Sequence, residues 1–148
     1  MRLLILCAAL LAPAFAQTAA VERAILEVNA QMTRAAEARD LDKMFSFILP
    51  NERGSIAQSG VLFLTREAAL DTMKRNSAPV EKVQYRPKHQ MVTVISADCA
   101  VLAADGEAEA SFADGTSVVA PYAQTVVFVR KDGEWKVLHA HYSSTPRR

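Results

Sequence analysis

Cysteine is scarce in this sequence, which has only Cys7 and Cys99. Cys7 lies in an N-terminal segment that we expect to be removed, so no disulfide can form within the mature chain. We expect Cys99 to be a small buried residue at the start of a strand, with pairing between two molecules as the alternative. A small domain held together by internal disulfides is excluded.

The chain also lacks an excess of charge of either sign, since 17 Lys and Arg residues stand against 16 Asp and Glu residues. Loss of Arg2 with the N-terminal segment would bring the net charge to zero. Adjacent cations occur only at Lys74-Arg75, Arg130-Lys131 and Arg147-Arg148. The sequence therefore predicts no nucleic acid partner, because such proteins gather basic residues on one face.

Long apolar runs are missing as well, because no later segment approaches the roughly 18 residues of a membrane-spanning helix. The first sixteen residues instead have the layout of a secretory signal peptide. Arg2 precedes the apolar run Leu3–Leu11, and Ala14-Phe15-Ala16 is a small-x-small cleavage site. We predict a signal peptide at 1–16, a mature domain at 17–148 and a periplasmic or secreted location, with no membrane association after cleavage. The alternative, a lipoprotein anchored through Cys7, would place that cysteine at the end of the run.

Helical periodicity begins at Thr18 and predicts a first helix that ends near Arg39. Its apolar residues recur at spacings of three and four: Val21, Ile25, Val28, Met32 and Ala35. Asp40 is typical of a helix cap, so a second, shorter helix is predicted to follow and to end at Pro50. The two helices are expected to meet at a corner near Asp40.

Two short strands are predicted at 55–57 and 61–64, because turn residues bracket both segments. Thr65 then begins a third helix, which Pro79 ends. Its apolar face is narrow, which favours a position at the edge of a sheet.

After Pro79 the apolar period changes to two, which is typical of strands. Long strands are predicted at 83–96, 100–112, 117–130 and 134–144, and turns with glycine separate the last three. Asp105-Gly106 inside the second of them is interpreted as a bulge, with a hairpin turn as the alternative. Helices followed by a meander of strands predict an α+β fold.

The closing segment VVFVRKDGEWKVLHAHYSS, together with this order of elements, resembles the nuclear transport factor 2-like superfamily in its SnoaL-like branch. The resemblance implies a cone-shaped fold in which three N-terminal helices pack on a curved antiparallel β-sheet. It also implies a pocket at the open end and a homodimer through the outer sheet face. The superfamily contains isomerases, cyclases, hydrolases, dehydratases and binding proteins, so the fold does not select an activity.

The resemblance matches the closing Trp of the branch to Trp135 and its terminal histidines to His139 and His141. Regular alternation along a strand would place these three side chains on one face. We therefore expect a ligand-binding wall formed by Trp135, His139, His141, Thr125 and Val127. Ala123 stands where branch members often have Arg, which argues against a role that needs a fixed cation there.

Two histidines at i and i+2 could also bind a metal if His89, Glu107 or Glu109 supplied a third ligand. The alternative is that both are hydrogen-bonded pocket or core residues. Because the set of ligands is incomplete, we predict no metal and no cofactor.

The predicted function is an exported small domain with a pocket for a small, largely apolar ligand. The alternative is a SnoaL-like enzyme of the isomerase, cyclase or hydrolase type that uses the pocket histidines as acid and base. No catalytic residue can be assigned, since Asp40 could cap a helix or border the pocket.

Two further sets of large side chains have a predicted position. One could line an apolar cavity or fill the core: Met32, Met44, Phe45, Phe47, Phe63 and Met73. The other is expected on the outer sheet face as an apolar dimer patch: Tyr122, Phe128, Leu138 and Tyr142.

Overall fold

A computed structural model describes residues 8–50 and 55–144 of the chain. The described helices are α1 (Ala8–Glu37), α2 (Leu41–Ser46) and α3 (Arg66–Ser77). The described strands are β1 (Ile56–Gln58), β2 (Val61–Phe63), β3 (Val80–Ser96), β4 (Cys99–Phe112), β5 (Ser117–Lys131) and β6 (Glu134–Ser144). None of these helices has the length and apolar character needed to cross a membrane.

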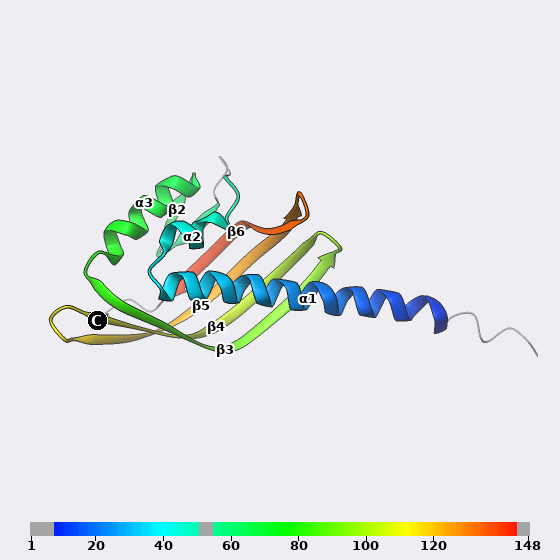
Figure 1. Ribbon diagram of the computed structural model, residues 1–148, viewed down its shortest axis with the longest axis horizontal. Coiled ribbons are helices and arrows are strands. Elements are labelled where there is room, and N and C mark those ends of the chain that lie inside the picture. The colour runs from blue at the N-terminus through cyan, green and yellow to red at the C-terminus, as the bar shows by residue number, and fades with distance from the viewer. Residues whose placement is uncertain (1–7, 51–54, 145–148) are drawn as a thin grey trace, which may run out of the picture.

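The six described strands form one sheet in the order β2-β1-β6-β5-β4-β3. Neighbouring strands are antiparallel except for β1 and β6, which run parallel. Figure 1 shows α1 lying across one face of the curved sheet, with α2 and α3 gathered near one end. The predicted α+β fold with helices on a curved sheet is confirmed.

Helix α1 packs through the predicted stripe. Val21, Ile25, Met32 and Ala35 are buried, and the half-buried Val28 packs against the same core. Figure 1 shows the N-terminal part of α1 extending beyond the sheet, where Phe15 is 72% exposed. Contact with the core therefore begins at Val21 among the described side chains.

Local side-chain chemistry begins the other two helices as predicted. The Asp40 carboxylate accepts a hydrogen bond from the Lys43 N–H at 2.9 Å, and the Thr65 hydroxyl accepts one from the Ala68 N–H at 3.1 Å. These caps satisfy backbone donors that the first helical turn leaves without partners.

Helix α1 ends in a Schellman motif, which makes the predicted corner. The Arg39 N–H donates to the Ala36 carbonyl and the Asp40 N–H donates to the Ala35 carbonyl, both at 2.9 Å. Arg39 takes a left-handed backbone conformation with φ of 60°.

Strand β4 runs without interruption through Asp105-Gly106, so the hairpin alternative is wrong. The irregularity lies in the same ladder, where the pairing skips Lys88 on β3 between Pro87 and His89. A Cβ at Gly106 would overlap the Arg86 carbonyl oxygen and lie 2.8 Å from the Pro87 Cα. The glycine therefore permits a close approach of the two backbones.

A second bulge lies in β6 and decides which side chains face the helices. Val127 pairs with His139 and Phe128 pairs with Val137, so Leu138 is an extra residue in β6. Because the bulge resets the alternation, His139 lies on the outer sheet face, opposite to Trp135. The regular alternation expected from the sequence is wrong at this point.

The inner face of β5 is likewise the reverse of the expected one. Phe128 is fully buried in the core, and Tyr122 and Tyr142 share its face, whereas Thr125 is exposed on the other side. Of the expected outer patch only Leu138 lies outside, with 36% exposure. The helices pack against the face of β5 that carries its larger side chains.

Candidate functional site

A cavity of about 710 Å³ lies between the three helices and the inner sheet face. The sheet leaves room for the cavity because strand β4 presents only small side chains there. Ala108 and Ala110 of β4 and Ala120 of β5 line it directly. The end of α1 leaves the space above them unfilled, and this combination creates the hollow.

The apolar wall of the cavity comes mainly from the helices. Three methionines contribute to it, and Met is a flexible side chain that adapts to varied shapes. The principal apolar residues of this wall are Met32, Met44, Phe45, Ile48 and Met73. From the sequence-derived set, Phe47 and Phe63 do not line the cavity and pack against the core instead.

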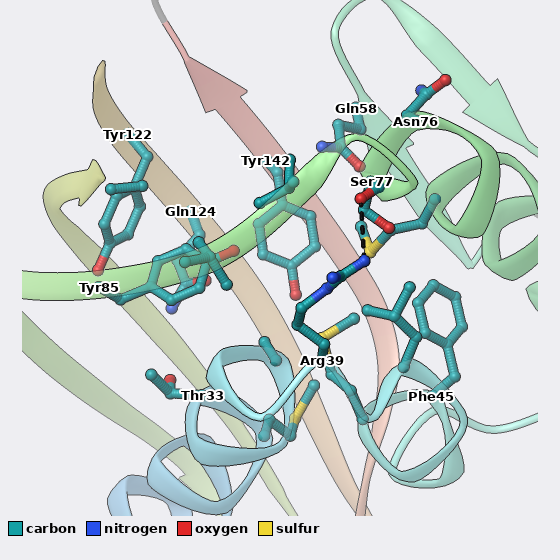
Figure 2. A pocket seen from close by; sticks show the side chains of 18 of the residues that line it. Thr33, Arg39, Phe45, Gln58, Asn76, Ser77, Tyr85, Tyr122, Gln124 and Tyr142 are labelled. Atoms are coloured by element: carbon teal, nitrogen blue, oxygen red, sulfur yellow. Dashed lines mark hydrogen bonds between the residues drawn. The ribbon is translucent and has the colours of Figure 1, made fainter. Parts of the chain in front are cut away.

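All three tyrosines of the chain line this cavity: Tyr85 on β3, Tyr122 on β5 and Tyr142 on β6. Figure 2 shows them along one side of the cavity. The Tyr85 and Tyr122 rings meet edge to face with centroids 5.8 Å apart. No described residue forms a hydrogen bond with any of the three hydroxyls.

The environment keeps these phenols protonated. Burial raises the pKa of Tyr142, and the nearby Tyr85 raises it further. Burial also raises the pKa of Tyr85, with contributions from Tyr122 and Glu37, and burial and Asp105 raise the pKa of Tyr122. Each hydroxyl is therefore a neutral hydrogen-bond donor at physiological pH.

Amide and carboxylate groups hold the polar side of the cavity in place. Gln124 on β5 donates to the Asn29 side-chain oxygen at 3.3 Å, which connects the cavity wall to α1. The Glu37 carboxylate accepts the backbone N–H of Tyr85 at 2.8 Å. This bond fixes the end of α1 against β3 and positions Tyr85.

Four charged side chains line the cavity: Arg39, Asp40, Asp42 and Lys74. Asp42 and Lys74 form an ion pair at 2.8 Å, while Asp40 caps α2. Asp40 thus both caps a helix and borders the pocket, the two roles that the sequence left open.

None of the five residues expected to bind ligand lines this cavity. Trp135 is buried in the core, and its ring lies beneath the Arg130 guanidinium, 4.9 Å from it. The other four share the outer sheet face, where His139 pairs with Val127 and His141 pairs with Thr125. Ligand binding by these residues stays a prediction from the sequence.

The three candidates for a third metal ligand are engaged in ion pairs on the outer face. His89 contacts Asp105 at 2.8 Å, Glu107 contacts Lys88 at 2.8 Å, and Glu109 contacts Arg86. Within residues 8–50 and 55–144, no three His, Cys, Asp or Glu side chains are grouped as metal ligands would be. Cys99 is a free, half-buried thiol at the start of β4.

Comparison with known protein families gives a match to the SnoaL-like domain over residues 25–147. The chain belongs to the SnoaL-like family. No curated protein matches this SnoaL-like chain.

Solved structures share the fold of this SnoaL-like domain at low sequence identity. A nuclear transport factor 2-like protein from Salmonella enterica serovar Typhimurium is 15% identical, with a TM-score of 0.77 over 88% of this chain and 94% of the other. The hexachlorocyclohexane dehydrochlorinase LinA-type3 from Novosphingobium barchaimii is 16% identical, with a TM-score of 0.73 and coverages of 88% and 90%.

A Caulobacter vibrioides protein with a cystatin-like fold is 13% identical, with a TM-score of 0.69 and coverages of 84% and 89%. At these identities the likeness of all three structures concerns the fold, and the chemistry of this SnoaL-like domain has to be argued from its own cavity.

Proposed function

We propose that this SnoaL-like domain binds a small, largely apolar molecule that carries a hydrogen-bond acceptor. The observation that carries the proposal is the gathering of all three tyrosines in one cavity, opposite a wall rich in methionine. A ligand that fills this space would bury its apolar body against the methionines. Its acceptor would pair with tyrosine hydroxyls that have no described partner.

The size and chemistry of the cavity support this proposal. Its volume of about 710 Å³ falls within the roughly 300–1,000 Å³ that is common for small-molecule sites. Such sites combine apolar walls with a few positioned polar groups, as Gln124 and the tyrosines are here.

The competing enzyme hypothesis relied on histidines in the pocket, and the β6 bulge places His139 and His141 on the other face of the sheet. The described lining contains no imidazole that could act there as acid or base. Binding is therefore the function that the cavity supports best.

A matched pair of substitutions on β4 tests the binding proposal. Ala108 faces the cavity and Ala103 is exposed on the outer face, so Ala108→Phe should fill the cavity while Ala103→Phe leaves it open. We expect the neutral fluorophore N-phenyl-1-naphthylamine to gain fluorescence with the unsubstituted protein and with Ala103→Phe. Ala108→Phe should abolish that gain.

Equal fluorescence with both variants would show that the probe binds elsewhere and would contradict the proposal. Circular dichroism and urea denaturation of each variant serve as the check on folding. Absence of any probe binding to the unsubstituted protein would also count against a ligand cavity.

We also propose that the domain is exported after cleavage behind Ala16. The first buried side chain described in α1 is Val21, so removal of residues 1–16 takes nothing described from the core. The intact mass of protein recovered from a periplasmic or culture fraction tests this proposal. A mature chain that still begins at Met1 would contradict it.

A homodimer through the outer sheet face is the third element of the proposal. That face exposes apolar side chains such as Met91, at 71%, and Val119, at 53%. Burial of these side chains against a second copy would remove apolar surface from water.

A further inference from the structure

Arg39 is the one cation of the described cavity lining whose side chain does not pair with a carboxylate. Its Nη2 donates to the Ser77 carbonyl at 3.3 Å, as the dashed line in Figure 2 marks. No described carboxylate lies within ion-pair distance of it. Because a guanidinium has five N–H donors, most of its hydrogen-bonding capacity is left for another partner.

The backbone at Arg39 provides a second and independent observation. Arg39 occupies the position of the Schellman motif that glycine usually fills, with φ of 60°. A side chain with a Cβ is disfavoured in this conformation, and such strain gathers at functional sites. An arginine here is unfavourable for the helix end, yet it directs a guanidinium into the cavity (Figure 2).

We propose that Arg39 recognises an anionic oxygen group, so that the ligand is an amphipathic molecule with a carboxylate, sulfonate or phosphate beside its apolar body. This inference rests on the proposed function, because it assumes that the cavity takes a small molecule. The planar guanidinium would form paired, charge-assisted hydrogen bonds with two oxygens of that group.

The remaining charges of the lining are compatible with this role. Asp42 is neutralised by Lys74 at 2.8 Å, and the Asp40 carboxylate accepts from the Lys43 N–H at 2.9 Å. Glu37, which lies two residues before Arg39, accepts the backbone N–H of Tyr85. Each nearby carboxylate is therefore directed at another group.

Calorimetric titration with two ligands of nearly the same shape tests the proposal. The ligands are 2-naphthoate, which is anionic, and 2-naphthamide, which is neutral. We expect the protein to bind the naphthoate about 10- to 100-fold more tightly, as one charged hydrogen-bonding group contributes. Arg39→Met should bind the two ligands equally, with the affinity for naphthamide retained.

Arg34→Met is the matched control, because Arg34 lies in the last turn of α1 shortly before Arg39, is exposed, pairs with Glu27 at 2.9 Å and does not line the cavity. It should keep the preference for naphthoate. Arg39→Gly should lose that preference while raising the midpoint of urea denaturation, since glycine accepts the left-handed conformation. This variant separates loss of the side chain from loss of folding.

The outcomes distinguish this inference from the proposed function. Equal binding of both ligands by the unsubstituted protein, or a preference that persists in Arg39→Met, would overturn the role of Arg39 and leave the ligand cavity standing. Binding of neither ligand would overturn both. Parallel titrations with naphthalene-2-sulfonate and 2-naphthyl phosphate then identify which anion Arg39 prefers.

Discussion

At the scale of single residues, the tyrosines connect the chemistry of the cavity to a measurable signal. Because the chain has no tyrosine outside the cavity lining, the phenol absorbance of the folded protein reports on this site alone. Their titration is also linked to stability, since the folded state disfavours the ionised form of each phenol.

The unfolding free energy should fall as the pH rises through about 10, the ordinary pKa of tyrosine. The folded pKa values are raised, so the unfolded chain releases phenolic protons first and ionisation favours unfolding. Tyr142→Phe should lose less stability between pH 8 and 11. Urea denaturation at several pH values measures this, and equal pH slopes for Tyr142→Phe and the unsubstituted protein would contradict it.

Residue-scale chemistry was also the part that the sequence predicted best. The caps at Asp40 and Thr65 depend on contacts within three residues, so local sequence contains the necessary information. The left-handed conformation of Arg39 could not be predicted in this way, because the residue type argues against it.

At the scale of elements, the predicted bounds of the four long strands agree with the structure to within about three residues, while the faces predicted for β5 and for β6 beyond its bulge do not. The extra residue Leu138 has no signature in composition, because a bulge arises from pairing with β5 rather than from β6 alone. One signal was available in β4. Asp105, Glu107 and Glu109 all fall on alternate positions, which predicts that Gly106 and Ala108 between them face inward.

The close contact between β3 and β4 predicts a strong effect at Gly106. Gly106→Ala should lower the unfolding free energy by about 1–3 kcal/mol, because its Cβ would meet backbone atoms that cannot move aside easily. Urea denaturation measures the loss. Ala103→Ser on the exposed face of the same strand should change stability by less than about 0.5 kcal/mol, and a similarly small effect at Gly106 would disprove the contact.

At the scale of the whole molecule, the cavity lies where the strands of the sheet continue beyond the C-terminal end of α1 (Figure 1). This arrangement depends on how the side chains of the helices meet those of the inner sheet face. The family resemblance implied a pocket. Its lining residues could not be predicted from the sequence, because they depend on which face of the sheet the helices cover.

The outer face of the sheet should mediate the dimer. Met91→Glu would place a charge within that interface and should convert a dimer to a monomer in light scattering at micromolar concentration. Leu64→Glu, at a residue that is 62% exposed and lies outside the long strands, is the control and should stay dimeric. A monomer for the unsubstituted protein would contradict the proposal.

The position of β6 inside the sheet has a consequence for how the chain is made. Although β6 is the last of the described strands in sequence, it pairs with β5 on one side and with β1 on the other. It also brings Trp135, Val137 and Ala140 into the core. During vectorial synthesis the β1–β2 hairpin therefore lacks its neighbouring strand until the ribosome has released Glu134–Ser144, so the domain can complete its sheet only after β6 has been made.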